Sequence, residues 1–179
     1  MRYRRIVAWM PVLLCVAAAG AQTPHQGRPP GPEKRLAYFD GAWRLEGSTT
    51  AASNHEVTFR TTEQNSWMAG GMFQLSRTTH THAESLEQAE RLAIRGYDPH
   101  AKVYTYDAFI STGEHETSRG TVDGDTWTWF AEWHEGDKLV KQRYIVKERS
   151  RDAYDFSTES AADGVHYTVT FTGKATRIK

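Results

Sequence analysis

The chain has 179 residues, in which 22 basic side chains balance 22 acidic ones and aromatic residues make up 12%. This balance gives no sign of a nucleic-acid or membrane-surface partner, because both attract strongly basic proteins. The length suits one domain with additional segments, and the aromatic content favours a compact β protein with a substantial core.

The first 21 residues have the pattern of a secretory signal peptide. Three arginines in the first five residues precede a short apolar run, Ile6–Ala18, and Ala19-Gly20-Ala21 supplies a small-x-small cleavage site. The run is shorter than the roughly 20 residues of a membrane-spanning helix and is interrupted by Pro11, which disfavours a permanent anchor. We therefore predict a periplasmic or secreted protein that keeps no membrane anchor after cleavage.

Cleavage after Ala21 would remove Cys15, the only cysteine, so the mature chain would have neither a disulfide nor a thiolate metal site.

Residues 22–32 are rich in Pro, Gly and Gln, which predicts a flexible linker. The remaining residues, 33–179, form the predicted folded domain. A short helix is expected at Pro32–Phe39, with Leu36 and Phe39 on one face.

From Trp43 onward, segments of high β propensity alternate with turn residues such as Asp98-Pro99, Asp123-Gly124 and Asp163-Gly164. No segment has the pattern of a crossover helix between parallel strands. About ten consecutive strands linked by hairpins predict an all-β, antiparallel up-and-down barrel, whose closure leaves no exposed edge. The predicted strands are Trp43–Thr49, His55–Glu63, Trp67–Arg77, Glu90–Tyr97, Val103–Ile110, Glu116–Val122, Thr126–Trp133, Leu139–Lys147, Tyr154–Ser160 and Val165–Thr176, with a less regular region at Thr78–Ala89.

The hairpin around Asp123-Gly124 indicates which face of its strands is buried. If these two residues form the turn, Gly120 lies opposite Trp127 and Ser118 opposite Trp129. The other face of this hairpin is polar, so Trp127 and Trp129 are expected to point into the barrel. Small residues opposite large ones would leave space beside the two rings.

The strand Val103–Ile110 allows two orientations. In one, Asp107 and Phe109 face inward together with Leu92 and Ile94 of the preceding strand; in the other, Tyr104 and Tyr106 face inward and Asp107 faces solvent. We favour the first orientation. A carboxylate inside the barrel would have to be paired, neutral or functional.

An ordered set of motifs runs through the domain: Phe39-x-Gly41-x-Trp43, Gly96-Tyr97-Asp98-Pro99, Asp123-Gly124-Asp125-x-Trp127, then Ser160 with Asp163-Gly164, and a closing Gly173. This set resembles the bacterial domain-of-unknown-function family 1579, from about Leu36 to Arg177. The resemblance implies a secreted, lipocalin-like barrel with no established activity. The Gly41-x-Trp43 opening also resembles that of lipocalins and related calycin barrels, in which this Trp plugs the closed end and a basic residue late in the chain packs on it. This resemblance implies that Trp43 is the plug and that Arg177 stacks on it.

Histidines at two places in the chain are candidate metal or haem ligands. His80 and His82, two residues apart with Glu84 nearby, could bind zinc or copper if they shared a strand face. The Gly-x-Trp opening is also similar to the start of nitrobindin-like haem barrels, for which His166 would be the candidate iron ligand. Solvated histidines explain both patterns more simply, so we expect no metal and no cofactor.

Catalytic and anion sites have weaker support. Ser118, Asp107 and His115 could form a triad only if folding brought them together, and the sequence contains no nucleophile elbow. Lys141 and Arg143 share a strand face that could bind an anion, although outward, solvated charges are the simpler interpretation.

We therefore predict that the barrel binds a small, largely apolar molecule. The residues predicted to line the site are Trp127, Trp129, Tyr144, Phe156, Phe171 and Asp107. Two alternatives remain open at this stage: an enzyme that uses Asp107 inside the barrel, and a structural or interaction protein with a filled interior.

Overall fold

The computed structural model describes residues 31–50, 56–82, 88–135 and 137–179. They form one short helix, η1 (Gly31–Phe39), and ten strands. The strands are β1 (Gly41–Thr50), β2 (Glu56–Trp67), β3 (Gln74–His82), β4 (Gln88–Asp98), β5 (Val103–Ile110), β6 (His115–Asp123), β7 (Thr126–Glu135), β8 (Lys138–Ser150), β9 (Ala153–Ala161) and β10 (Thr168–Arg177). The signal peptide and residues 22–30 of the predicted linker lie outside the described residues.

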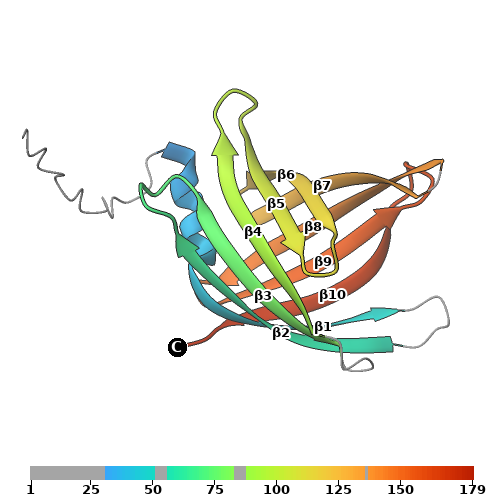
Figure 1. The fold of residues 1–179 in the computed structure, drawn as a ribbon, viewed down its shortest axis with the longest axis horizontal. Coiled ribbons are helices and arrows are strands. Elements are labelled where there is room, and N and C mark those ends of the chain that lie inside the picture. The colour runs from blue at the N-terminus through green and yellow to red at the C-terminus, as the bar shows by residue number, and fades with distance from the viewer. Residues whose placement is uncertain (1–30, 51–55, 83–87, 136) are drawn as a thin grey trace, which may run out of the picture.

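Each strand pairs antiparallel with its neighbours in sequence, and β1 pairs with β10 to close the barrel (Figure 1). The predicted fold class, a closed ten-stranded antiparallel barrel with a short N-terminal helix, is confirmed. Closure begins beside the Gly-x-Trp motif, where Trp43 of β1 is the partner of Arg177 of β10. No helix among the described residues is long and apolar enough to cross a membrane.

The helix η1 is a 3-10 helix that begins one residue before the predicted start. Its buried side chains, Glu33, Leu36 and Phe39, are spaced by three residues. This spacing matches the three residues per turn of a 3-10 helix, so all three lie on one face. Leu36 is fully buried and Phe39 is 4% exposed, which shows that η1 covers one end of the barrel and seals it.

One predicted strand was placed wrongly. The prediction of Trp67–Arg77 as a strand ran through a turn, because β2 extends to Trp67 and β3 begins only at Gln74. Between them, Gly70 and Gly71 adopt positive φ angles of 91° and 69°, which favour glycine. The Met-Ala-Gly-Gly-Met-Phe stretch is therefore a turn at the end of the barrel that η1 covers.

The register of the β6–β7 hairpin also differs from the prediction. Asp123 pairs with Thr126, so the two turn residues are Gly124, with φ 56°, and Asp125. Gly120 consequently lies opposite Trp129 rather than Trp127. The shift is by two residues, which preserves the alternation of the strand, and both tryptophans point inward as predicted.

Candidate functional site

The closed end of the barrel is built around Trp43. Its side chain is fully buried, and its Nε1 donates a hydrogen bond of 2.9 Å to the carbonyl oxygen of Phe39. The Arg177 guanidinium lies 4.2 Å from the centre of the Trp43 ring, as the sequence predicted. Arg177 also donates hydrogen bonds to the carbonyl oxygens of Tyr38 and Asp40, and its Nε lies 3.0 Å from Asp152 Oδ1. The plug therefore joins the first strand, the last strand and η1.

Above the plug, a buried polar network crosses β2, β3 and β4. Arg95 donates hydrogen bonds to Asn65 Oδ1 at 2.8 Å, Glu63 Oε1 at 2.9 Å and Gln74 Oε1 at 3.4 Å. Asn65 in turn donates to Glu63 Oε1 and to the carbonyl oxygen of Phe39, both at 2.8 Å. Gln74 donates to the carbonyl oxygen of Leu36. The network thus provides donors for carbonyl groups at the end of η1, which the helix itself leaves unpaired.

Glu63 and Arg95 are both charged in this network. Burial alone would raise the pKa of Glu63, but the Arg95 guanidinium and the Asn65 amide outweigh it, so the pKa of Glu63 lies below its usual value. Burial likewise opposes the charge of Arg95, and the Glu63 carboxylate raises the pKa of Arg95 above its usual value. Arg95 also lies over the Phe39 and Tyr106 rings, 5.2 Å and 5.6 Å from their centres. This arginine is fully engaged by the protein itself.

The opposite wall of the interior is aromatic. Trp127 and Trp129 of β7 stack with an interplanar angle of 4° and a centroid distance of 6.1 Å. Phe156 lies 5.7 Å from Tyr144 and 5.8 Å from Phe171, measured between ring centres. The structure therefore gathers the five predicted aromatic residues on adjacent strands, β7 to β10, of one inner wall.

Glycines hold the rings of this wall close to the sheet. A Cβ on Gly120 would lie 2.5 Å from Trp129 Cε3, and a Cβ on Gly173 would lie 2.4 Å from Phe156 Cζ. Real Cβ atoms do not approach so closely, so each ring lies directly over a glycine on the neighbouring strand. The space that we expected beside Trp129 is thus occupied by the Trp129 ring itself. Any ligand would contact the face of these rings that points into the barrel.

Exposure of the inward-facing side chains changes along the barrel axis. At the closed end, Trp127 has no accessible surface and Tyr154 has 3%. In contrast, Tyr106, Tyr144 and Phe171 pack against the core but remain partly accessible. The barrel is therefore filled at the end covered by η1, and inward-facing side chains further along retain some accessible surface. Trp127, although predicted to line the site, belongs to the filled part.

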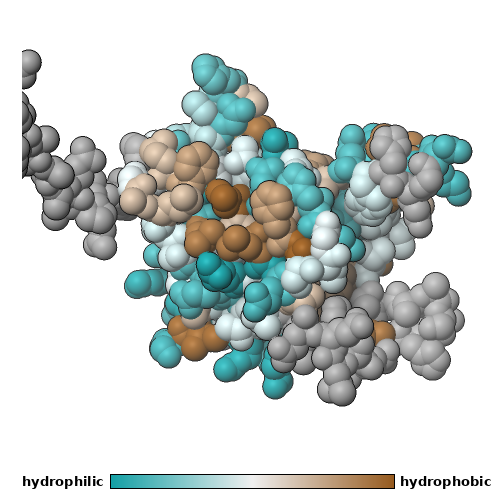
Figure 2. Space-filling model, viewed as in Figure 1, coloured by the Kyte–Doolittle hydropathy of each residue, from teal (hydrophilic) through white to brown (hydrophobic). Residues whose placement is uncertain are grey.

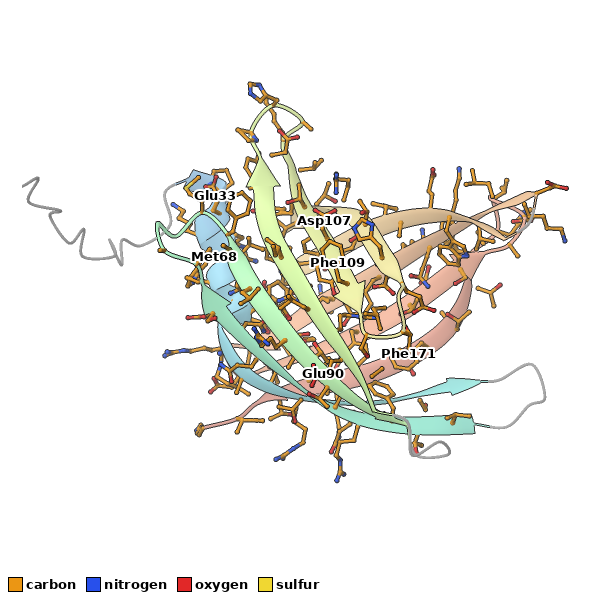
Figure 3. The ribbon with its side chains drawn as sticks, in the orientation of Figure 1. Glu33, Met68, Glu90, Asp107, Phe109 and Phe171 are labelled. Carbon is orange, nitrogen blue, oxygen red and sulfur yellow. The ribbon has the colours of Figure 1, made fainter. Side chains whose placement is uncertain are left out.

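The structure contradicts the favoured orientation of Asp107. Tyr104 is 6% exposed and Tyr106 contacts Trp129, so these tyrosines face inward. Asp107 faces outward, where it accepts a hydrogen bond of 3.0 Å from Thr117 Oγ1, and Phe109 on the same face is 55% exposed (Figure 3). Asp107 therefore does not line the interior, and the enzyme hypothesis that depended on it loses its acid.

The inner face of β4 was also predicted wrongly. Leu92 is 37% exposed on the outer face, whereas Ala93 and Arg95 are buried inside. Apolar side chains are exposed on this outer face: Leu92 pairs with Phe109 of β5, and Phe73, which precedes β3, lies against Gly96 of β4. Figure 2 shows brown, apolar surface in the middle of the view. An outer face with more aliphatic and aromatic residues than the inner one explains why hydrophobic alternation indicated the wrong side.

The alternative triad and the haem ligand are not assembled among the described residues. Ser118 faces inward from β6, whereas Asp107 faces outward from β5. The His115 ring stacks on the exposed ring of Phe109. His166 lies in the turn before β10, where its side chain is 86% exposed and its Nδ1 is 2.6 Å from Asp163 Oδ2.

The strand face of Lys141 and Arg143 is solvated and paired. Arg143 pairs with Glu159 and lies over the Tyr167 ring, and Lys141 Nζ is 3.9 Å from Glu132. His80 and His82 are two residues apart in β3, but their side chains lie outside what the structure describes. The part of the chain that is described contains no group of three ligating side chains suited to a metal ion.

A hollow of about 700 Å³ lies outside the barrel, over β1, β10, β9 and β8. Its charged side chains are largely paired with each other or with neighbours: Arg149 Nε is 2.6 Å from Asp155 Oδ2, and Lys147 pairs with Asp125. Outward residues on a curved, twisted sheet produce such a hollow without a ligand. The accessible half of the interior is the better candidate site.

The polar side of this interior was not predicted from the sequence; it consists of Glu63, Asn65, Gln74, Arg91 and Arg95. The signal was present as alternation, since Glu63 and Asn65 are two residues apart and so are Arg91, Ala93 and Arg95. Charged residues normally lie on the solvent side of a sheet, so this alternation did not indicate that these polar side chains face the interior.

The chain matches the family model described as "Protein of unknown function (DUF1579)" over residues 28–177, and it therefore belongs to that family. Among solved structures it is similar to Rv2717c from M. tuberculosis, with a TM-score of 0.56 and 11% sequence identity. That similarity covers 83% of this chain and 99% of the other, and at this identity it shows the fold alone. Among curated proteins, none matches this chain.

Proposed function

We propose that this member of the DUF1579 family binds a small, largely apolar molecule in the accessible half of its barrel. The observation that carries the proposal is the inner aromatic wall, on which Tyr144 and Phe171 retain accessible surface although they face inward. Aromatic surface that remains wet inside a concave site gains free energy when an apolar ligand covers it.

The wall would contact the ligand through Trp129, Tyr144, Phe156 and Phe171, and Trp127 would support it from below. Trp127 is held by the core, since its Nε1 donates a hydrogen bond of 2.7 Å to Glu148 Oε1 and its ring lies 5.0 Å from that of Phe39. Its position would fix Trp129 through the stacked pair. The rival view of a structural protein with a filled barrel is disfavoured by the accessible surface of the upper aromatic residues.

Binding can be measured with N-phenyl-1-naphthylamine, a neutral dye whose emission rises in apolar surroundings. We expect saturable binding by the wild-type protein. Phe171→Ala should weaken binding about tenfold, because part of the apolar contact is lost. Phe109→Ala is the matched control, since that ring lies on the outer face and is 55% exposed. Absence of saturable binding, or equal effects of both substitutions, would contradict the proposal.

We propose further that the protein is exported, on the basis of the basic, apolar and small-residue succession in residues 1–21. The intact mass of protein recovered from the periplasm or the medium should correspond to a chain that begins near Gln22. A recovered chain that still begins at Met1 would show that the segment is not removed.

A further inference from the structure

The interior contains a second arginine, Arg91, whose surroundings differ from those of Arg95. Arg91 faces inward from β4, two residues before the buried Ala93 and three residues after the start of the strand at Gln88. The start of β4 is distant from the end covered by η1, because η1 seals the end at which β4 finishes. Arg91 therefore lies in the accessible half of the barrel, near the mouth.

Arg91 is only partly satisfied by the protein. Its Nη2 lies 3.2 Å from Glu116 Oε1, and the Tyr106 phenol is a further partner of the guanidinium. Its Nε is buried without a hydrogen-bond partner, which holds for no other buried side-chain nitrogen or oxygen of the described residues. A guanidinium can donate five hydrogen bonds, and a buried donor without an acceptor is costly. Arg95, by comparison, has three side-chain acceptors.

The carboxylate of a ligand can displace Glu116, the ion-pair partner of Arg91. Glu116 lies near the start of β6 with 45% of its side chain exposed, and the Arg91 side chain is 29% exposed. Ion pairs of this exposure contribute little to stability, so an incoming anion would lose little by displacing Glu116.

The residues beside the pair on the inner face of β4 and β5 are small. Ala93 and Ala108 are direct partners on β4 and β5, and Ala108 is also the partner of Glu116. Both alanines are buried and small, so no bulky side chain separates Arg91 from Glu116 on the inner face. Tyr106, which faces inward between Arg91 and Arg95, supplies a phenol group next to Arg91.

We infer that the barrel selects an amphiphile with a carboxylate head group, which Arg91 binds near the mouth while the apolar chain covers the aromatic wall. The inference rests on the proposed function, because the wall must accept the apolar chain. A carboxylate matches the planar guanidinium with two parallel hydrogen bonds, which an alcohol or an ester cannot form.

The test compares two competitors of equal chain length, decanoate and 1-decanol, in displacement of N-phenyl-1-naphthylamine from the wild-type protein. Decanoate should bind about tenfold more tightly than 1-decanol, the difference expected for one charge-assisted contact. Arg91→Gln should remove this preference and leave the affinity for 1-decanol unchanged. Arg77→Gln is the control, since Arg77 is an exposed, outward-facing residue on the adjacent strand β3.

A second variant keeps the test decisive if Arg91→Gln does not fold. Glu116→Gln removes the competing carboxylate, so it should tighten decanoate binding and leave 1-decanol unaffected. Equal affinities of the two competitors for the wild-type protein would overturn the inference and leave the proposed function intact. Equal losses in Arg91→Gln and Arg77→Gln would indicate general charge attraction and also overturn it. If neither the dye nor either competitor binds, the proposed function and the inference both fail.

Discussion

Replacement of Arg95 by methionine tests whether the buried polar network stabilises the fold. Methionine retains much of the apolar stem but leaves the Glu63 carboxylate without its cation, and it removes the donor to Asn65 Oδ1. Removal of one partner from a buried ion pair typically destabilises a protein by about 3–5 kcal/mol. Because Arg95 and Glu63 are each about 10% exposed, we expect a loss in that range at pH 7.

The pH dependence gives the experiment a second readout. In the wild-type protein the pKa of Glu63 is lowered by Arg95, so the stability that this carboxylate contributes at neutral pH is lost as pH falls through its folded pKa. Without Arg95, burial would raise the pKa of Glu63 in the folded state. The variant would then gain stability from protonation at low pH and lose it as pH rises, so its deficit should be smaller at pH 4 than at pH 7.

The free energy of unfolding can be measured in urea by tryptophan emission, at both pH values. Arg77→Met is the control, and its exposed position predicts a change within about 0.5 kcal/mol. The double variant Glu63→Gln with Arg95→Met should be more stable than Arg95→Met alone, because no unpaired charge remains. A deficit below about 1 kcal/mol at pH 7, or an equal deficit at pH 4, would refute this account of the network.

Four further substitutions test other parts of the barrel. Trp43→Ala should lower the free energy of unfolding by about 3–5 kcal/mol, and Arg177→Ala should cost less; an effect of Trp43→Ala within about 0.5 kcal/mol would exclude a plug. Gly120→Ala should cost about 1–3 kcal/mol and alter the tryptophan emission spectrum, because Trp129 must move; an unchanged spectrum would mean that the ring does not lie over the glycine. Burial raises the pKa of Tyr38 to about 12, so alkaline pH between about 10 and 12 should destabilise the protein less after Tyr38→Phe, as unfolding monitored at several pH values would show.

The closure of the barrel could be predicted because its strands and turns have strong local signals. Val103–Ile110 coincides with β5, since Asp98-Pro99 and Ser111-Thr112-Gly113 mark its two ends. These strand ends require only turn chemistry and chain order. The Trp43–Arg177 contact, in contrast, was implied by the resemblance of the Gly-x-Trp opening to that of lipocalins.

The inner face of β4 and β5 could not be predicted in the same way. Alternation identifies two faces but not which one is buried, and here the outer face carries Leu92 and Phe109 while the inner face carries Arg91 and Arg95. The preference for buried Arg95 depends on Glu63, Asn65 and Gln74, which come from two other strands. Only the assembled barrel brings these partners together, so the polar half of the interior could not be predicted from the sequence of any one strand.

Both ends of the described domain lie on the side sealed by η1. Gly31 begins the helix that covers this end, and Arg177 lies against Trp43 beneath it, close to the C-terminus in Figure 1. An attachment to a bead, a sensor surface or a fusion partner through either end would therefore hold the molecule by its closed base and leave the mouth facing the solution. Immobilisation through these ends is a practical route to measuring ligand entry, because the tether and the entrance are on opposite sides.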